Sequence, residues 1–301
     1  MLESDLIQEV QAIFSRGIDR DLLVPNGDDG AVFVSDKQIV VSADVCVSGV
    51  HFNEEWSTPL EIGRKVTAAN LADICAMGGW PKYLIATLVL PNEKGVLELA
   101  RGIAEEADRV GARVIGGDLS TGSELAISIT AIGETLQPIR RSGAKVGDHV
   151  YVSNLPGSSA AGLYILKSGL KPISELEREL VSKHKAPTID YAKYKNAFPL
   201  ASAAIDISDG LLMDAARIAK ASNVKINFDK EVLANSQLRE FDGARYLDWV
   251  MRGGEDHVLL CTSTSVIPGF IDIGSVTAGS GIELNGEEIE IGGYSHQWPS
   301  G

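Results

Sequence analysis

The first half of the chain alternates between stretches with the period of a strand and stretches with the period of a helix. Short apolar runs predict four strands, at Lys37–Cys46, Tyr83–Pro91, Ala112–Ile115 and Leu125–Ile132. Apolar positions spaced three and four residues apart predict helices over Ile62–Met77 and Val96–Val110, and Gly111 ends the second of these. The first segment, "MLESDLIQEVQAIFSRG", has early acidic residues and alternating polarity, so it predicts an amphipathic helix and not a signal peptide.

The periodicity breaks at "GETLQPIRRSGAKVGD", where Pro138 and several glycines interrupt it. We place a domain boundary there, which gives domains of residues 1–137 and 138–301. The second half predicts strands at His149–Ser153, Val224–Phe228 and His257–Thr262, and helices at Ala160–Lys167, Ser174–His184 and Gly210–Ala221. Asn285-Gly286, within Ile282–Ile291, is typical of a two-residue hairpin. The predicted fold class is α/β, or α+β, in two domains.

Composition and charge limit the possible partners. The 301 residues are 45% hydrophobic and 23% charged, as in an ordinary globular protein, and no apolar stretch reaches the roughly 18 residues of a membrane span. The formal net charge of −14 argues against nucleic acid and anionic membranes as partners. Phosphates would have to be held by backbone N–H groups and metal cations. Cys46, Cys75 and Cys261 are widely spaced in apolar surroundings, which is typical of reduced thiols in the cytoplasm.

Acidic residues recur where apolar strands are expected to end. The stretches "GDDGAVF", "VVSADVCVSGVHF", "VIGGDLS" and "AIDISDG" contribute Asp29, Asp44, Asp118, Asp206 and Asp209. Asp73 differs because it lies inside a predicted helix, with Asn70 one turn earlier on the same face. Each residue alone has an ordinary explanation as a turn or a helix cap, and we expect Asp209 to cap the helix that follows it. Together, oxygen ligands in this number favour Mg²⁺.

Two loops have small residues that let backbone N–H groups face an anion. One is Ser153–Gly162, between a strand and a helix, and the other is Gly116-Gly117 before Asp118. The first is neither a Walker A loop nor the G-x-G-x-x-G of a dinucleotide site. Arg140-Arg141 is one of very few basic pairs, and it either lies on a solvated surface or contacts a nucleotide phosphate. Small residues at a helix start also serve packing, so these loops alone do not decide the function.

Seven motifs, in order, resemble those of the thiamine-monophosphate kinases, and they extend from about Gly27 to the final "GYSHQW". They are "GDDGAVF", "SAD…GVHF", "KVTAANLADICAMGG", "VIGGDLS", "RSGAKVGDHVYVSNLPGSSAAGL", "AIDISDGL" and "GGEDHVLL". Each motif is weak alone, but the ordered set is specific. The resemblance implies an N-terminal mixed sheet with helices that dimerises and a C-terminal α/β domain, with the chain acting as a homodimer.

The resemblance also implies ATP-dependent phosphorylation of thiamine monophosphate to thiamine diphosphate, with several Mg²⁺ ions. The family's Mg²⁺ ligands fall on Asp29, Ser42, Asp44, Asp73, Asp118, Asp206 and Asp209. Its ATP contacts fall on Gly116 or Gly117, Arg141 and Ser208. Its substrate contacts fall on His51, Glu255 and a C-terminal aromatic residue, either Tyr294 or Trp298. Ala43 departs from the family, which usually has threonine there, so a ligand at this position would be the backbone carbonyl.

The acceptor phosphate is largely a dianion at neutral pH, so it needs no general base to act as a nucleophile. We therefore expect direct in-line transfer, without a phosphoenzyme and without a catalytic side chain, assisted by cations that offset the repulsion between the phosphates. Alternation along the strand end places Asp206 and Ser208 on one face. With Asp209, they would face the acidic residues of the first domain across an active site.

Two alternatives stay open. Another superfamily member, such as aminoimidazole ribonucleotide synthetase, shares most of these motifs, although "GVHF" and "GGED" favour the thiamine enzyme. A selenophosphate synthetase would need a reactive cysteine near the N-terminus and a hydrogenase maturation protein a C-terminal one, and this sequence has neither. A non-catalytic nucleotide-binding protein on the same scaffold would have lost several of the aspartates, and here nearly all are present.

Overall fold

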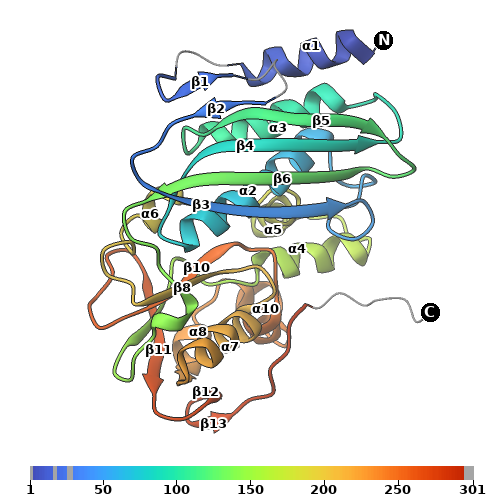
Figure 1. Ribbon diagram of the computed structural model, residues 1–301. Helices are drawn as coiled ribbons and strands as arrows, with labels where there is room; N and C mark the ends of the chain where they lie inside the picture. Colours follow the sequence, from blue (N-terminus) through green and yellow to red (C-terminus); the bar gives the residue numbers. More distant parts are fainter. Residues whose placement is uncertain (1–2, 16–18, 26–29, 295–301) are drawn as a thin grey trace, which may run out of the picture. The chain divides into compact units, whose positions relative to one another are not determined.

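The computed structural model describes residues 3–15, 19–25 and 30–294. The chain divides into two compact units, Met1–Pro138 and Ile139–Gly301, called unit 1 and unit 2 (Figure 1). Each unit has its own sheets and helices. The mixed α and β content confirms the predicted fold class. Among the described residues, no helix has the length and hydropathy required to cross a bilayer.

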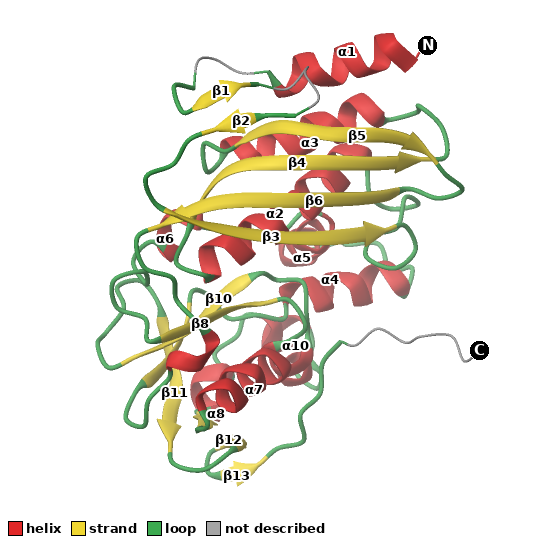
Figure 2. Cartoon of the chain, in the orientation of Figure 1, coloured by secondary structure: helices red, strands yellow, loops and turns green. Residues whose placement is uncertain are grey.

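Unit 1 is built on a four-stranded mixed sheet in the order β3-β6-β4-β5 (Figure 2). Its strands are β3 (Gln38–Val47), β4 (Trp80–Leu90), β5 (Arg113–Thr121) and β6 (Ala126–Thr135). β4 and β5 are parallel, so they need a crossover connection, which helix α3 (Val96–Asp108) provides. Helix α2 (Pro59–Ala76) packs with α3 on one face of the sheet. The N-terminal segment forms α1 (Glu3–Phe14), as predicted, followed by β1 (Leu22–Val24) and β2 (Val32–Phe33).

Two glycines let α2 and α3 pack backbone against backbone. A Cβ atom at Gly63 would lie 2.3 Å from the carbonyl oxygen of Leu99, and one at Gly102 would lie 2.1 Å from that of Leu60. α2 begins at a capping box, in which the Thr58 hydroxyl accepts the N–H of Glu61 and the Glu61 carboxylate accepts the N–H of Thr58. The start of α2 and its contact with α3 together fix the position of this helix.

The two faces of the unit 1 sheet differ in exposure. Successive residues of β3 point to opposite faces, and Ile39, Val41 and Val45 are 43%, 61% and 56% exposed. Ser42 and Asp44 alternate with these residues and contact α2. An exposed apolar row therefore lies on the face of β3 that points away from the helices.

Unit 2 has a seven-stranded sheet in the order β13-β12-β9-β11-β7-β10-β8, in which β12 and β9 pair parallel and the other pairs are antiparallel. The strands are β7 (His149–Val152), β8 (Ala203–Ile207), β9 (Lys225–Phe228), β10 (Val258–Ser263), β11 (Ile271–Thr277), β12 (Gly281–Leu284) and β13 (Glu287–Glu288). The helices are η1 (Arg141–Gly143), α4 (Ser158–Lys167), α5 (Glu175–Lys185), α6 (Tyr191–Tyr194), α7 (Leu211–Ser222), α8 (Lys230–Leu233), α9 (Leu238–Phe241) and α10 (Tyr246–Arg252).

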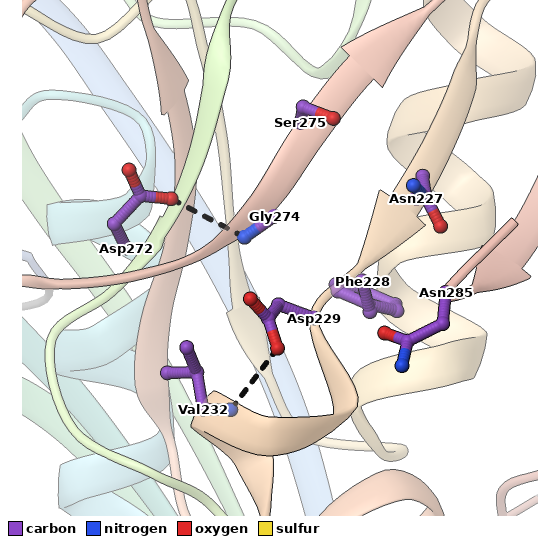
Figure 3. Close-up of a pocket in the computed structure, with 8 residues that line it drawn as sticks. All are labelled: Asn227, Phe228, Asp229, Val232, Asp272, Gly274, Ser275 and Asn285. Carbon is purple, nitrogen blue, oxygen red and sulfur yellow. Dashed lines mark hydrogen bonds between the residues drawn. The ribbon is translucent and has the colours of Figure 1, made fainter.

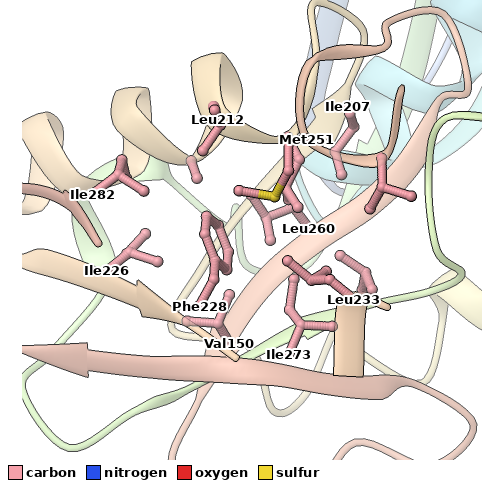
Figure 4. Packing of buried hydrophobic residues seen from close by; sticks show 14 of the residues in the cluster. Val150, Ile207, Leu212, Ile226, Phe228, Leu233, Met251, Leu260, Ile273 and Ile282 are labelled. Atoms are coloured by element: carbon pink, nitrogen blue, oxygen red, sulfur yellow. The ribbon is translucent and has the colours of Figure 1, made fainter. Parts of the chain in front are cut away.

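The core of unit 2 packs aliphatic residues of the sheet and of α7 around Phe228 and Met251 (Figure 4). The predicted hairpin is confirmed: β12 and β13 pair across Asn285 and Gly286, whose φ angles of 52° and 83° suit a tight turn. The sequence did not predict β11. Its period is broken at Gly274, where a Cβ atom would lie 2.2 Å from the carbonyl oxygen of Asn227, next to a register shift in its pairing with β7.

The contact between α2 and α3 gives a prediction with a definite sign. Gly102→Ala should destabilise the protein by about 1–3 kcal/mol, because the added methyl group meets the Leu60 carbonyl. Helix propensity alone predicts the opposite, a gain of about 1 kcal/mol for replacing glycine by alanine. Denaturant unfolding measures the change, with Arg101→Ala as the control at an exposed position of α3. A Gly102→Ala protein as stable as the wild type would contradict the packing described.

Candidate functional site

In unit 1, helix α2 and strand β3 bring together four of the polar residues singled out in the sequence. The Ser42 hydroxyl donates to Asp73 Oδ2 at 2.6 Å, and the Asp44 N–H donates to Asn70 Oδ1 at 3.1 Å. Asn70 and Asp73 thus share the face of α2 that meets β3, as their spacing predicts. Asn70 is held in turn by its own donation to the Val66 carbonyl at 2.9 Å. The Asp44 and Asp73 carboxylates therefore project from two elements that are tied to each other.

A cavity of about 770 Å³ in unit 1 contains Gly116, Gly117 and Asp118 of β5. Its other walls are largely apolar and come from α1, the region of β2, and β4, with Val10, Phe14, Phe33, Ile85 and Leu88 among them. A Cβ atom at Gly117 would lie 1.9 Å from the Ala86 carbonyl oxygen, so only glycine lets β5 pair with β4 at this point. A Cβ atom at Gly116 would meet no described atom within 4 Å. The cavity thus has apolar walls and a polar end at Asp118.

The expectation that the acidic residues stand at strand ends is wrong for two of them. Asp44 lies within β3 and Asp118 within β5, whereas Asp206 is the second-last residue of β8. The polar residues and glycines interrupt the apolar pattern, but the strands continue because their backbones still pair with neighbours.

His51 lies in the turn that follows β3. Its Nδ1 accepts the N–H of Val47 at 3.1 Å, which fixes the ring orientation and places the proton of the neutral ring on Nε2. His51 can therefore present an N–H donor from a fixed position.

In unit 2, the end of β8 holds Asp206, Ser208 and Asp209. Asp206 is 4% exposed, and its Oδ2 lies 3.2 Å from Nδ1 of His257, which is also buried. Ser208 and Asp209 both donate their N–H groups to Oδ2 of Asp214, at 3.1 and 3.0 Å. Burial raises the pKa of Asp214 to about 7, and the nearby Asp206 charge adds to this, although Arg217 opposes it. The turn after β8 is thus tied to a buried carboxylate of the following helix.

Asp209 does not cap α7, contrary to the expectation. The N-cap residue of this helix is Gly210, and the Asp209 carboxylate pairs instead with the Arg217 guanidinium. A Cβ atom at Gly210 would lie 2.7 Å from the Arg252 carbonyl oxygen, so the chain passes too close to α10 for a larger residue. Asp214 reaches back from the first turn of α7 and accepts the N–H groups of Ser208 and Asp209, which precede the helix.

The "GGED" segment packs directly against the turn after β8. Glu255 donates its N–H to the Ser208 carbonyl at 2.8 Å, and a Cβ atom at Gly254 would lie 2.3 Å from the same oxygen. Glu255 has a φ of 64°, an uncommon backbone conformation for a non-glycine residue. Its Oε2 lies 3.7 Å from Nδ1 of His184. Glu255 is thereby fixed beside Ser208 with its side chain about one third exposed.

Tyr294 completes this cluster. Its N–H donates to the Asp209 carbonyl at 2.9 Å, and the residue is 46% exposed. Unit 2 therefore brings five of the predicted residues to one edge strand and its turn: Asp206, Ser208, Asp209, Glu255 and Tyr294.

Arg141 is not part of this cluster. It lies in η1, where its carbonyl accepts the hydroxyl proton of Ser222 at the last residue of α7, whereas Asp209 and Gly210 precede the first. Gly143 packs against the Ser202 carbonyl, before the start of β8. Within unit 2, Arg141 thus lies near the last residue of α7 and before the start of β8. Ser208 lies at the opposite end of each of these two elements. Asp29 and Trp298, the other predicted site residues, lie outside the described residues.

Sequence reasoning missed Asp256, which occupies the N-terminus of α4. Its carboxylate accepts the N–H of Gly157 at 2.6 Å and that of Ser159 at 2.9 Å. The loop Ser153–Gly162, considered as an anion site, is thus already bound to an anion from the protein itself. The signal for this role was an acidic residue between "GG" and a buried strand.

In each unit, the candidate metal ligands are oxygen atoms of carboxylate and hydroxyl groups. Among the described residues, no group of three or more histidine, cysteine, aspartate or glutamate side chains is close enough to hold a metal ion by itself. Mg²⁺ commonly takes only one or two carboxylates and completes its shell with water and substrate phosphates. Two pairs fit that kind of binding: Asp73 with Ser42, and Asp206 with the turn at Asp209.

Unit 2 has a hollow of its own, which is lined by residues of β9 and β11 and by Asp229, Val232 and Asn285 (Figure 3). It contains none of the predicted site residues. Its polar side chains bond to nearby backbone: Asp229 accepts the N–H of Val232, and Asp272 accepts that of Gly274. These bonds shape the surface of the sheet.

Comparison with known proteins places this geometry in a family. Residues 27–135 match the family described as AIR synthase related protein, N-terminal domain. The thiamine-monophosphate kinase of Mycobacterium tuberculosis is 38% identical over 280 residues, which are 89% of this chain and 83% of that protein. The crystal structure of thiamine-monophosphate kinase from Stenotrophomonas maltophilia has a TM-score of 0.85 at 31% identity and covers 96% of this chain and 98% of its own. AaThiL complexed with AMPPCP and TMP has a TM-score of 0.81 at 32% identity, covering 98% and 97%.

The buried Asp256 predicts a pH dependence of stability. Burial raises its pKa from 3.8 to about 6, and the N–H donors of Gly157 and Ser159 offset only part of this. The folded state therefore binds a proton more tightly than the unfolded state, so this residue destabilises the fold as pH rises from 4 to above 6. The loss is at most about 3 kcal/mol.

The free energy of unfolding of the wild type, minus that of Asp256→Asn, should fall over this pH range, as measured by denaturant titration. Asp248→Asn, at a side chain that is 65% exposed, is the control and should show no such trend. A difference that stays constant from pH 4 to 7 would rule out the raised pKa.

Proposed function

We propose that this chain, which belongs to the thiamine-monophosphate kinase family, transfers the γ-phosphoryl group of ATP to thiamine monophosphate and forms thiamine diphosphate. The chain is an enzyme of the kinase class and shares sequence and fold with these kinases over most of its length. The complex of AaThiL with AMPPCP, an ATP analogue, and TMP supports this pair of substrates. No disulfide joins Cys46, Cys75 and Cys261, which agrees with a reaction in the cytoplasm.

The cavity of unit 1 is the observation that carries this proposal. Its apolar walls, including Phe14 and Phe33, suit a nucleotide base, and its polar end at Gly116–Asp118 suits the phosphates. Small residues allow the phosphates to approach the backbone, as the absence of described atoms within 4 Å of a Cβ at Gly116 illustrates. We assign ATP to this cavity, and the contacts with Arg141 and Ser208 stay predictions of the family resemblance.

Several Mg²⁺ ions fit the oxygen donors, and when bound they would offset the charge of both phosphates. The residues that would hold them are Asp29, Ser42, Asp44, Asp73, Asp118, Asp206 and Asp209. The hydrogen bond from Ser42 to Asp73 holds one of these carboxylates in a single orientation before any ion arrives.

The acceptor needs no proton removed, so the remaining residues bind and orient it. The Nε2–H of His51 is suited to a phosphate oxygen, and the Glu255 carboxylate to the amino group or a ring nitrogen of the thiamine moiety. Tyr294, or Trp298 in its place, is suited to stack on the cationic thiazolium ring. Transfer is then direct and in line between the two phosphates.

We also propose that the chain is a homodimer. The row of Ile39, Val41 and Val45 on β3 is an apolar strip of the kind that subunit interfaces cover. Sedimentation at micromolar concentration decides this point, and a monomer would exclude it.

The function is tested by incubating the purified chain with ATP, Mg²⁺ and thiamine monophosphate and measuring thiamine diphosphate. Thiamine and an aminoimidazole ribonucleotide precursor serve as competing candidate substrates, and neither should be phosphorylated. A γ-phosphate made chiral with oxygen isotopes should be transferred with inversion, whereas retention would exclude direct transfer. Absence of thiamine diphosphate would overturn the proposal.

Asp73→Asn should lower turnover by at least about 100-fold, since an amide is a poor ligand for Mg²⁺. The fold should persist because the amide oxygen of the variant can still accept the Ser42 hydroxyl proton. The matched control is Asp36→Asn, an exposed residue of unit 1, which should keep wild-type turnover. Near-normal turnover of Asp73→Asn would show that the metal assignment is wrong.

Side chains of increasing size at Gly116 should raise the KM for ATP in the order alanine, valine, leucine. Each added carbon fills the cavity, while the fold tolerates it because the position is open. Steady-state kinetics and thermal melting separate the two effects. Ser120→Val, at an exposed position of the same strand outside the cavity, is the control. An unchanged KM for ATP in the leucine variant would move the nucleotide out of this cavity.

A further inference from the structure

Arg217 joins two carboxylates at the start of α7. One guanidinium nitrogen donates to Oδ1 of Asp214 and the other to Oδ2 of Asp209. Asp214 is completely buried, whereas the side chains of Asp209 and Arg217 are 26% and 38% exposed. The planar fork of arginine can bridge two acids in this way, and a lysine ammonium cannot do so with the same geometry.

The Asp214 end of this bridge is fixed. Its second oxygen, Oδ2, accepts the N–H groups of Ser208 and Asp209, so the carboxylate is bonded on both sides. Arg217 is therefore anchored within one helical turn, and its positive charge stays beside Asp209. The bridge is a feature of the structure that the family resemblance did not point to.

The position of this charge affects any cation that Asp209 binds. Asp206, Asp209 and Glu255 place three carboxylates at this edge of unit 2, and their charge would attract a divalent ion even without a nucleotide. Arg217 opposes that attraction in two ways: it holds one oxygen of Asp209, and its charge repels the ion at close range. The phosphates of a nucleotide bound at Ser208 would restore the missing negative charge.

We propose that Arg217 is a positioning residue that partly neutralises Asp209, so that a divalent cation binds this edge of unit 2 weakly by itself and tightly together with nucleotide. The proposal rests on the role proposed for Asp209 as a metal ligand. Arg217 thereby favours binding of the cation together with the phosphates over binding of the cation alone.

The test measures Mn²⁺, as a paramagnetic substitute for Mg²⁺, by electron paramagnetic resonance of the free ion, with and without AMPPCP. Without nucleotide, Arg217→Gln should bind Mn²⁺ at least about five-fold more tightly than the wild type, because the repelling charge is gone. Glutamine can still donate one hydrogen bond to Asp214. The ratio of Mn²⁺ affinity with AMPPCP to that without should fall in this variant, an effect that a purely structural role would not produce.

A double-mutant cycle with Asp209→Asn shows whether the effect passes through that residue. Asp209→Asn alone should weaken Mn²⁺ binding, and in its background Arg217→Gln should change the affinity by less than about two-fold. Lys220→Gln removes one positive charge from an exposed position of the same helix and should leave the affinity near that of the wild type. Arg217→Lys keeps the charge but loses the fork of the guanidinium, so its gain in Mn²⁺ affinity should be smaller. This variant replaces Arg217→Gln in the test if the glutamine variant does not fold.

The outcomes separate this inference from the proposed function. If Asp209→Asn leaves Mn²⁺ binding unchanged, Asp209 is not a ligand, and both the metal assignment and the inference fail. If Asp209→Asn weakens binding but Arg217→Gln does not tighten it, the inference alone is overturned. A gain that persists in the Asp209→Asn background, or that Lys220→Gln reproduces, would also overturn it, since the effect would then be a general one of net charge.

Discussion

A carboxylate that leaves water must receive hydrogen bonds or a counter-charge, and the structure of unit 2 depends on how its buried aspartates meet this requirement. Asp256 accepts two N–H groups at the N-terminus of α4. Asp214 accepts two more from the turn after β8 and pairs with Arg217. Asp206 faces His257 at the start of β10. Each of these bonds connects one segment of unit 2 to another.

The same requirement distinguishes Asp214, whose role is structural, from Asp209 and Asp118, which are proposed as metal ligands. An oxygen that already accepts two N–H groups, such as Oδ2 of Asp214, offers little to a cation. Asp209 keeps part of its carboxylate exposed, and Asp118 lines a cavity. Burial by itself is therefore a poor guide to function among these residues, and the partners of each oxygen atom are a better one.

Long periodic segments were predictable from sequence because local period reports which face is buried. The helix predicted over Ile62–Met77 is α2, and the runs at Lys37–Cys46 and Tyr83–Pro91 are β3 and β4. The predicted strand Ala112–Ile115 was too short, because β5 runs on to Thr121 through two glycines. That extension depends on the close approach of Gly117 to Ala86, a tertiary contact that no local pattern contains.

The candidate site was likewise predictable from the sequence only in part. Motifs pointed to Asp206, Ser208, Asp209, Glu255 and Tyr294 without showing that they share one edge of unit 2, which the contacts of Ser208 with Glu255 and of Asp209 with Tyr294 establish. Local reasoning made Asp209 the helix cap, since it stands directly before the helix. It could not show that the Asp209 carboxylate pairs with Arg217, or that Asp214, five residues later, reaches back to accept the N–H of Asp209.

An acidic surface is a surprising place to bind two phosphate esters, and the proposed function resolves this through its dependence on cations. A site rich in lysine would bind ATP without metal and would hold the diphosphate product just as tightly. A site rich in carboxylates repels a bare phosphate, so nucleotide and cation each improve the binding of the other. That reciprocity is strongest when the cation alone binds weakly. The charge of Arg217 beside Asp209 acts in this direction, because it reduces the attraction for a lone ion while the phosphates of ATP can still supply what it removes.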